Sequence, residues 1–525
     1  MDFARKTFPI MLGLSCLAAF SAAAADLTAE QVRTMRYDAA HKHRRMIFNN
    51  DGGDAVVQAK AGTPEAVLEA RTTALADTHV DSIFYSTSRG TFGSFTHRTE
   101  VGETFVSKEG RFSKNVTGDL IAQGTDPLEV MVDFARVHDM EIFWSMRMND
   151  THDSWGYEWE DIVTSQLKKD HPEWLVGSKE NKPPHGGFKA ADYTHPEIRD
   201  YAFRYIEEVC NNYDVDGVEM DFFRHPVFFK RHAWGENVTQ EERDMMTKLV
   251  RRVRIMMDER GAERGKPILL AVRVPDSVAY CRAIGLDIET WLEEGLIDLM
   301  TISGYFRLNP WKTSVELGHR YGVPVYPCLS ETRFREKEAR SIRASAESYR
   351  GRALNAWAQG VDGIYMFNFF NPKRELWSQL GEPAIIKKHD RLYTTGARNV
   401  SVLKRWVPNG ERFLNRKFVS PSDKHKIEPG NVFSVPLMVG ESLSETQPKS
   451  AQLELRFEEL PEPDTITVTV NGTVLETLEP DGAWLKGPVP YDAVKMGENA
   501  IEVSQSENAK APIVWNDLVL RIDQE

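Results

Sequence analysis

Short segments rich in β-branched and aromatic residues alternate with helical segments from about residue 45 to residue 390. We expect strands at residues 46–50, 81–87, 141–148, 217–223, 268–274, 296–305, 323–329 and 363–369. The expected helices lie at residues 64–77, 127–138, 196–212, 239–260, 287–294, 314–320, 338–359 and 375–390. Parallel strands need long crossovers, which helices supply. The alternation therefore predicts an α/β fold, a (β/α)8 TIM barrel, with an open doubly wound sheet as the alternative.

The pattern changes after about residue 398. Apolar and polar residues now alternate at 452–457, 465–470, 500–503 and 518–522, and Asn-Gly, Asp-Gly and Pro turns separate these stretches. Val470-Asn471-Gly472 is a strong hairpin signal. We predict a barrel domain at residues 26–397 and an accessory β-sandwich domain at 398–525, which either packs on the barrel or binds sugar.

The N-terminal residues resemble a secretory signal. Arg5 and Lys6 precede an apolar run over residues 8–20, and small residues fill 21–25. A membrane anchor, the alternative, needs about 20 apolar residues. We predict a signal peptide at 1–25, an exported protein that is periplasmic or extracellular, and no integral membrane segment once the signal is removed.

The cysteines and the charge balance exclude several classes of protein. Cys210, Cys281 and Cys328 remain after the signal, an odd number at wide spacings, which argues against a disulfide framework. We expect them to be buried. The chain has 78 Asp and Glu against 65 Lys and Arg, a formal charge of −13, so a nucleic-acid partner is not expected.

No cofactor or catalytic metal is expected either. The chain has no GxGxxG, HExxH or GxSxG motif. His41-Lys42-His43 has the His-x-His form of some metal-dependent barrels, but it precedes the first strand. It should therefore lie at the end of the barrel opposite the active site.

The fourth expected strand carries the most informative pair of residues. Side chains alternate along a strand, so Glu219 and Asp221 share one face, roughly 7 Å apart. Two acids buried together can serve glycosidic hydrolysis, in which one carboxyl stays protonated and donates a proton while an ionised one attacks or activates water. The alternative is an ion pair with Arg147 or Arg273.

Other strand ends add polar groups to the same end of the barrel. We predict Glu331, after the seventh strand, as a second catalytic carboxylate opposite Asp221, with Asp276 as its substitute. A surface position for Glu331 is the alternative. The residues expected to bind the sugar hydroxyls, an anionic substituent or a sugar ring face are Arg147, Asn149, Asp150, Trp155, Arg273, Asp276, Tyr305 and Asn368.

Two segments resemble a known family. Residues 191–201, ADYTHPEIRDY, and 215–226, VDGVEMDFFRHP, are similar to segments of the glycosyl-hydrolase-like family 10 group of secreted barrels, and residues 171–175 also fit. The likeness covers about residues 130–230. It implies a glycoside-hydrolase-like (β/α)8 barrel and points to Asp221 as the group's strand-four aspartate.

These observations predict a secreted glycoside hydrolase that cleaves O-glycosidic bonds of a polysaccharide or oligosaccharide, including sulfated or uronic-acid-containing ones. Asp221 would be the nucleophile or the base, and Glu331 or Glu219 the proton donor. One alternative is a sugar-binding barrel without catalysis in a polysaccharide-utilisation system. Another is a barrel hydrolase that acts on a different bond, such as a deacetylase or a phosphodiesterase.

Overall fold

The computed structural model describes residues 27–332, 334–396 and 400–524. The predicted signal peptide at 1–25 lies outside the described residues. Within the described part, no helix has both the length and the apolar character needed to cross a bilayer.

Eight parallel strands close into a barrel, in the order β1, β2, β5, β6, β7, β8, β9, β10. Their bounds are Met46–Asn50, Val80–Tyr85, Glu141–Arg147, Gly217–Asp221, Leu269–Val274, Leu299–Ile302, Val325–Ser330 and Ile364–Phe367. The predicted (β/α)8 fold is confirmed, and the doubly wound alternative is wrong because β10 pairs with β1 and leaves no free edge.

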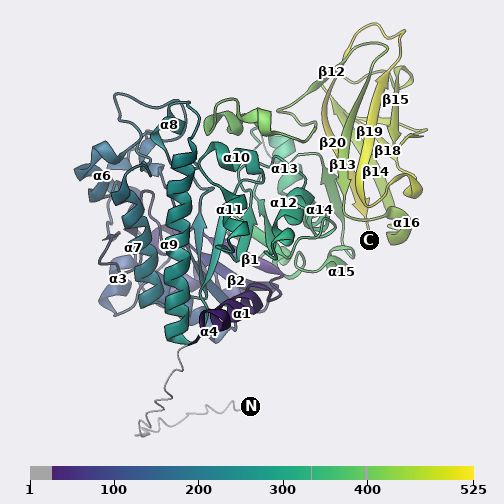
Figure 1. Ribbon diagram of the computed structural model, residues 1–525. Helices are drawn as coiled ribbons and strands as arrows, with labels where there is room; N and C mark the ends of the chain where they lie inside the picture. Colours follow the sequence, from purple (N-terminus) through teal and green to yellow (C-terminus); the bar gives the residue numbers. More distant parts are fainter. Residues whose placement is uncertain (1–26, 333, 397–399, 525) are drawn as a thin grey trace, which may run out of the picture.

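Helix α1 (Ala29–Ala40) precedes the first strand, and other helices connect the barrel strands. The longer connecting helices are α2 (Pro64–Arg71), α4 (Pro127–Val137), α7 (Pro196–Asn212), α9 (Gln240–Arg264), α12 (Trp311–Arg320), α13 (Lys337–Ala344) and α14 (Ala346–Trp357). Shorter ones are α3 (Thr117–Ala122), α5 (Glu160–Val163), α6 (Gln166–Asp170), α8 (Lys230–Ala233), α10 (Val278–Ala283) and α11 (Ile288–Glu293). Helices such as α7 and α9 lie on the outside of the barrel (Figure 1). The helix expected at 375–390 is only a 3-10 turn and α15 (Pro383–Ile386), since Gly381 and Pro383 interrupt it.

The entry into β6 shows how the bottom of the barrel is fixed. Asp216 accepts hydrogen bonds from the Ile142 backbone N–H at 2.9 Å and from Arg136 at 2.8 Å. The next residue, Gly217, packs against Phe143, whose ring would lie 2.2 Å from an added Cβ. Asp216 therefore ties β6 to β5 at the end of the strand opposite Asp221.

The chain after the barrel forms two antiparallel sheets with a shared apolar core. One sheet contains β11 (Arg391–Thr394), β12 (His425–Ile427), β14 (Ser450–Phe457), β17 (Glu479–Asp481), β18 (Trp484–Pro488) and β20 (Ile513–Asp523). The other contains β13 (Val432–Val439), β15 (Ile466–Val470), β16 (Thr473–Val474) and β19 (Gly497–Gln505). The predicted sandwich is confirmed, and its first sheet also takes in β11, which precedes residue 398.

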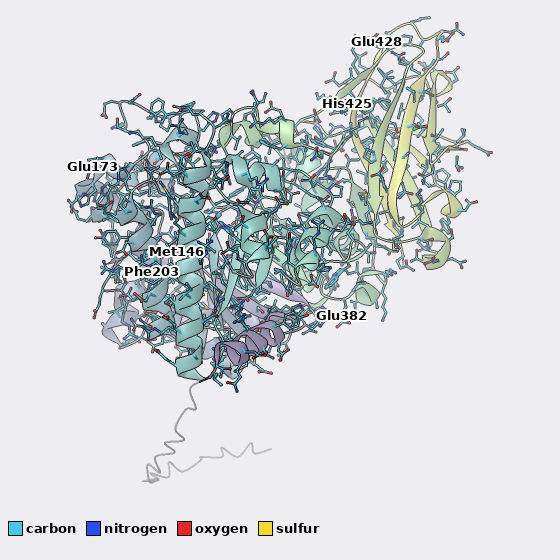
Figure 2. All side chains as sticks on the ribbon, in the orientation of Figure 1. Met146, Glu173, Phe203, Glu382, His425 and Glu428 are labelled. Carbon is cyan, nitrogen blue, oxygen red and sulfur yellow. The ribbon has the colours of Figure 1, made fainter. Side chains whose placement is uncertain are left out.

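The hairpin turn and the buried cysteines predicted from the sequence are also present in the structure. Asn471 and Gly472 have φ of 51° and 85° in the hairpin between β15 and β16, as an Asn-Gly turn requires. Cys210, Cys281 and Cys328 are buried free thiols, as expected. Met146 and Phe203 are buried in the barrel, whereas Glu173 and Glu428 are exposed (Figure 2).

A buried ion pair joins the barrel to the sandwich. Arg343 of α13 contacts Asp517 of β20 through two hydrogen bonds, of 2.8 and 2.6 Å, and both side chains are fully buried. A bidentate pair of this kind fixes the geometry of both partners.

We expect Asp517→Asn to lower the free energy of unfolding by about 3–5 kcal/mol, because it leaves the Arg343 charge buried without a partner. Urea unfolding followed by tryptophan fluorescence measures the change. Lys404→Ala is the control, since it removes an exposed ion pair with Glu411. Equal stability of the two variants would contradict the role given to the buried pair.

Candidate active site

Glu219 and Asp221 of β6 point into the barrel, as the alternation of side chains along a strand predicts. Glu219 is fully buried and Asp221 is 2% exposed. Glu219 accepts hydrogen bonds from Ser145 of β5 at 2.5 Å, Thr301 of β8 at 2.9 Å and Tyr365 of β10 at 3.0 Å. Since these strands lie on different sides of the barrel, the Glu219 carboxyl group occupies its interior.

Asp221 is held at the C-terminal end of β6. Its Oδ1 accepts hydrogen bonds from the backbone N–H groups of Phe223 and Arg224, at 2.9 and 3.0 Å, and from Arg273 Nε at 2.9 Å. Its Oδ2 accepts one hydrogen bond, from Arg273 Nη2. The ion pair with Arg273, one of the alternatives considered from the sequence, is therefore present, and Oδ2 is the less engaged oxygen.

Glu219 has a raised pKa and can hold a proton near neutral pH. Burial, assisted by the nearby charge of Asp221, raises the pKa of Glu219 to about 7, and the charge of Arg273 opposes the rise. The three hydroxyl groups around it suit either protonation state, because a hydroxyl can donate or accept. Two adjacent carboxyl groups thus differ in environment: Asp221 has a guanidinium partner, whereas the hydrogen-bond partners of Glu219 among the described residues are neutral.

The two residues proposed to lie opposite Asp221 have different surroundings. Glu331, directly after β9, is exposed. Its position across the barrel from Asp221 stays a prediction. Asp276, after β7, is buried and accepts hydrogen bonds from the backbone N–H groups of Leu308 and Asn309 at 2.9 Å. Asp276 therefore anchors the loop after β8, and burial raises its pKa.

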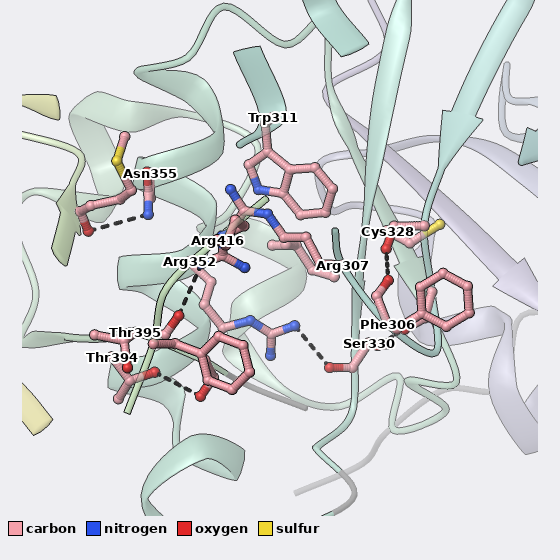
Figure 3. A pocket seen from close by; sticks show the side chains of 16 residues that line it. Phe306, Arg307, Trp311, Cys328, Ser330, Arg352, Asn355, Thr394, Thr395 and Arg416 are labelled. Carbon is pink, nitrogen blue, oxygen red and sulfur yellow. Dashed lines mark hydrogen bonds between the residues drawn. The ribbon is translucent and has the colours of Figure 1, made fainter. Parts of the chain in front are cut away.

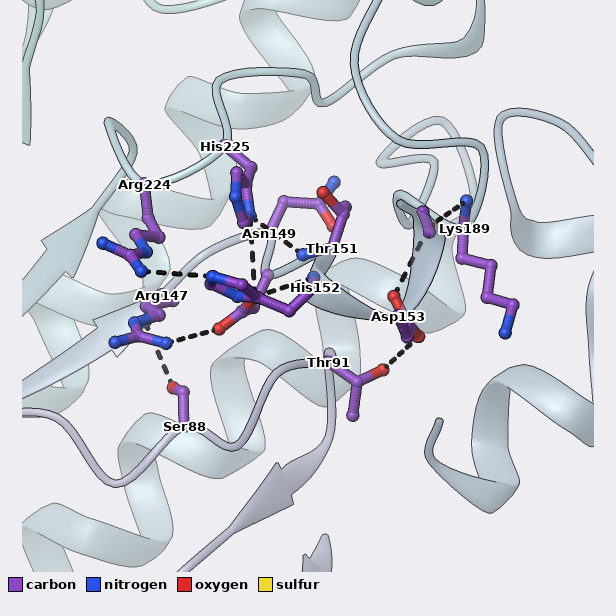
Figure 4. A network of polar contacts seen from close by, with 12 residues as sticks. Ser88, Thr91, Arg147, Asn149, Thr151, His152, Asp153, Lys189, Arg224 and His225 are labelled. Carbon is purple, nitrogen blue, oxygen red and sulfur yellow. Dashed lines mark hydrogen bonds and ion pairs between the residues drawn. The ribbon is translucent and has the colours of Figure 1, made fainter. Parts of the chain in front are cut away.

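A second polar network follows β5 (Figure 4). Arg147 Nη1 donates to Asp150 Oδ2 at 2.6 Å, and His152 Nδ1 lies 2.5 Å from Asp150 Oδ1. Although burial opposes ionisation, the charges of His152 and Arg147 hold the pKa of Asp150 well below its usual range. Asp150 is therefore an ionised carboxylate between two donors, and it has no exposed surface.

The remaining predicted sugar-binding residues are two asparagines and two aromatic residues. Asn149 uses its amide to join two loops: its Nδ2 donates to the carbonyls of Ala191 and Val227 at 2.9 and 2.7 Å. Asn368 is also buried, just after β10, with φ of 54°. These contacts give Asn149 a structural role.

The aromatic candidates lie beside arginines. Tyr305 stacks on Phe223, with ring centroids 5.8 Å apart, and the Arg224 guanidinium is 5.6 Å from the centre of the Tyr305 ring. Trp155 is partly exposed, and the guanidinium of Arg405 is 3.9 Å from its ring centre.

The structure adds charged residues that the sequence reasoning missed. Asp51, directly after β1, is hydrogen-bonded to Arg71 at 2.5 Å, and its side chain is 25% exposed. Burial alone would raise its pKa, but the charges of Arg71, Arg147 and Arg224 lower it. The Asp51-Gly52-Gly53-Asp54 turn after the first strand was the available signal, because strand C-termini of a barrel carry its active site.

Arg224 is a further addition. Its Nε and Nη1 atoms are buried and have no hydrogen-bond partner among the described residues. Its Nη2 contacts His152 Nε2 at 3.2 Å. We call the C-terminal ends of the barrel strands, with the loops that follow them, the barrel mouth. Arg147, Arg224 and Arg273 make this mouth rich in cations, and Arg71 at the end of α2 adds a further charge through its contact with Asp51.

Asp150, His152 and His225 have potential metal-binding atoms within 4.8 Å of one another. Other groups already occupy them: His225 Nδ1 accepts the Thr151 N–H at 2.9 Å, and Arg147 and Arg224 contact Asp150 and His152. Two guanidinium charges beside the cluster disfavour a divalent cation. His41 and His43 are exposed and precede β1, at the other end of the barrel.

We expect Glu219→Gln to stabilise the protein by about 2 kcal/mol more at pH 8 than at pH 5, relative to wild type. The raised pKa means that folded Glu219 keeps its proton up to about pH 7. Its stabilising contribution is present below the unfolded pKa and is lost as the pH rises through the folded pKa. The substituted amide cannot titrate, so the variant lacks that loss.

Urea unfolding of both proteins at the two pH values measures this difference. The control is Glu498→Gln, which changes an exposed side chain of β19. A Glu219→Gln effect that is the same at pH 5 and pH 8 would show that Glu219 does not change protonation in this range.

Comparisons with known structures return distant similarities. An α-L-fucosidase from Paenibacillus thiaminolyticus is 11% identical over 66% of this chain and 48% of its own, with a TM-score of 0.39. An α-amylase from Anoxybacillus is 10% identical over 90% of this chain and 99% of its own, also at 0.39. A cycloisomaltooligosaccharide glucanotransferase from Paenibacillus sp. is 9% identical over 91% of this chain and 57% of its own, with a TM-score of 0.33. Scores this low establish no shared activity.

The sequence comparisons are more specific. No curated protein matches the chain. Residues 99–248, which include β5, α7 and β6, match the model of a family described as Glycosyl hydrolase-like 10. The segment contains Arg147, Asp150 and Asp221. This match and the closed parallel barrel confirm the predicted resemblance to a glycoside-hydrolase-like (β/α)8 family.

Proposed function

We propose that this protein is an exported glycoside hydrolase that cleaves O-glycosidic bonds of a polysaccharide or oligosaccharide at the barrel mouth. The observation that carries the proposal is the carboxylate of Asp221, oriented by Arg273 at the C-terminal end of β6, inside the segment that matches the family model. Barrel enzymes place their catalytic groups at these strand ends.

The chemistry requires one ionised carboxylate and one proton donor. In the proposed mechanism Asp221 Oδ2 either attacks the anomeric carbon or takes a proton from water. Arg273 fixes the orientation of the Asp221 carboxylate, which lowers the reorganisation needed in the transition state. The positive charge that develops on the sugar ring in the transition state is then stabilised by a negative group held in place.

Glu331 is our proposed proton donor, because it follows β9 and is exposed, so it can reach a glycosidic oxygen. Glu219 keeps a proton near neutral pH, but its full burial beneath the mouth makes it a better partner for Asp221 than for substrate. Retention or inversion of the anomeric centre depends on the Asp221–Glu331 separation, about 5 Å or about 6.5–9.5 Å.

Binding groups surround this position. The proposed sugar contacts are Arg224, whose Nε and Nη1 have no partner among the described residues, Tyr305 beside it and the partly exposed Trp155. Arg147 and Arg273 each have an aspartate partner, so they contribute to electrostatic balance more than to recognition of an acidic sugar.

One observation favours a second candidate, a sugar-binding barrel without catalysis. Asp51, Asp150 and Asp221 are all ion-paired with arginines. Carboxylates bound in this way can serve purely as scaffolding for the mouth. Such a protein would bind glycans and release no reducing ends.

We expect Asp221→Asn to lower the rate of reducing-end release by at least about 100-fold, because an amide is neither a nucleophile nor a base. The measurement is a screen of neutral, uronic-acid-containing and sulfated polysaccharides with both proteins. Asp216→Asn is the matched control: it changes another arginine-paired aspartate at the opposite end of β6 and should keep full activity.

Circular dichroism and thermal unfolding establish that the variants are folded. Hydrolysis unaffected by Asp221→Asn would exclude the proposed mechanism. Glycan binding by the wild type without release of reducing ends would identify the non-catalytic barrel instead.

A further inference from the structure

Three arginines meet in a cavity between the barrel and the sandwich (Figure 3). Arg307 comes from the loop after β8, Arg352 from α14, and Arg416 from the segment before β12. The cavity measures about 80 Å³ and also contacts the ends of β8 and β9 through Ser303 and Ser330. It therefore lies at the same end of the barrel as Asp221.

Each guanidinium is anchored by a backbone carbonyl. Arg307 Nε donates to Asn309 O, Arg352 Nη2 to Ser330 O, and Arg416 Nη2 to Thr395 O, each at 2.9 Å. A carbonyl oxygen fixes the orientation of a guanidinium but does not neutralise its charge. The three guanidinium charges therefore remain unneutralised by these contacts.

No carboxylate lies within ion-pair distance of any of these three arginines in the described parts of the chain, whereas Arg147, Arg273 and Arg343 each have an aspartate partner. The charge of Asp276 raises the pKa of Arg307 and Arg416, but its carboxylate already accepts hydrogen bonds from backbone N–H groups.

Burial lowers the pKa of all three arginines, and the charge of Arg416 lowers that of Arg307 further. The cluster is thus short of negative charge.

Two of the donors lack a partner. Arg307 Nη2 and Arg352 Nη1 are buried and make no hydrogen bond among the described residues. Buried polar atoms are nearly always satisfied in folded proteins, and an exception calls for an explanation such as a missing ion. Both unsatisfied guanidinium nitrogens lie in one cavity, and because the groups are cationic, a negatively charged hydrogen-bond acceptor would satisfy them best.

The walls restrict the size of that acceptor. Phe306, Trp311 and Phe418 line the cavity, and the guanidinium of Arg307 lies 4.0 Å from the centre of the Trp311 ring. Arg307 therefore covers one face of Trp311, and the ring is buried as a whole, so it is not open to stacking on a sugar. Ser303 and Thr395 also line the cavity, and their hydroxyl groups donate to the backbone carbonyls of Phe306 and Val419. The cavity suits a compact anionic group more than a whole pyranose ring.

We propose that Arg307, Arg352 and Arg416 form a binding site for an oxyanion: a sulfate, phosphate or carboxylate group. Guanidinium groups match the oxygen geometry of such groups and bind them through paired hydrogen bonds. The oxyanion is either a free inorganic ion or a substituent of an acidic sugar. The proposal stands without glycosidic hydrolysis, since it concerns binding alone.

Titration of sodium sulfate into the full chain, by calorimetry at constant ionic strength set with chloride, tests the site. We expect saturable binding of one sulfate that weakens at least tenfold in Arg352→Gln and in Arg416→Gln. Arg416→Lys should bind more tightly than Arg416→Gln, because it keeps the charge. Arg412→Gln is the matched control: Arg412 is an exposed arginine of the same segment that donates to the Pro408 carbonyl, and its loss should leave binding unchanged.

A thermal shift of the wild type supplies a measurement that does not depend on the variants folding. Sulfate stabilises most proteins at high concentration because it is excluded from their surfaces, so the measurement is made at low millimolar sulfate. In that range sulfate should raise the unfolding temperature along a saturating curve that chloride does not give, since the bound ion joins segments of the barrel and of the chain that leads into the sandwich. Absence of saturable binding, or equal binding by wild type and both glutamine variants, would overturn the proposal.

Galactose 6-sulfate and galactose distinguish the two sources of the anion. Tighter binding of the sulfated sugar than of inorganic sulfate supports a site for a sugar-borne group, and equal or weaker binding supports a site for the free ion. Loss of hydrolysis in Asp221→Asn with sulfate binding unchanged would separate this site from the catalytic proposal.

Discussion

The ion pair between Asp221 and Arg273 is the interaction on which the centre of the barrel depends. It lies above Glu219, and all three side chains are almost entirely buried. Removing charges from water is costly unless partners and hydrogen bonds compensate them. The guanidinium compensates Asp221, and protonation combined with three hydroxyl partners reduces the cost for Glu219. The barrel thereby holds a polar interior at the level where chemistry is proposed.

Arginine has two uses at this end of the molecule. Around Asp51, Asp150 and Asp221, arginines neutralise carboxylates and set their orientation. At the junction with the sandwich, Arg307, Arg352 and Arg416 are held by carbonyl oxygens instead. Arginine side chains therefore stabilise carboxylates of the protein at the first place, and at the second they form the oxyanion site that we propose. Arg147 and Arg273, both predicted to bind sugar, belong to the first group, and the oxyanion site that we propose uses a different set of three arginines.

The sandwich contributes to the site by its position. Arg343 pairs with Asp517 across the junction, and Arg416 reaches the cavity from the segment that leads into the first sandwich strands. The C-terminal part thus bounds one side of the barrel mouth. The accessory role of the sandwich stays a prediction.

The sequence by itself determined the barrel, the sandwich and the inward direction of Glu219 and Asp221, because hydrophobic periodicity and strand alternation are local properties. It also located β1 at its observed bounds and the Asn471-Gly472 turn. Only the tertiary structure decided which charges meet. Arg273 is 52 residues from Asp221 in the sequence. Asn149 donates its hydrogen bonds to loop carbonyls, and the three cavity arginines come from segments far apart in the chain. Pairing across a closed barrel depends on distances in space, which no local pattern encodes.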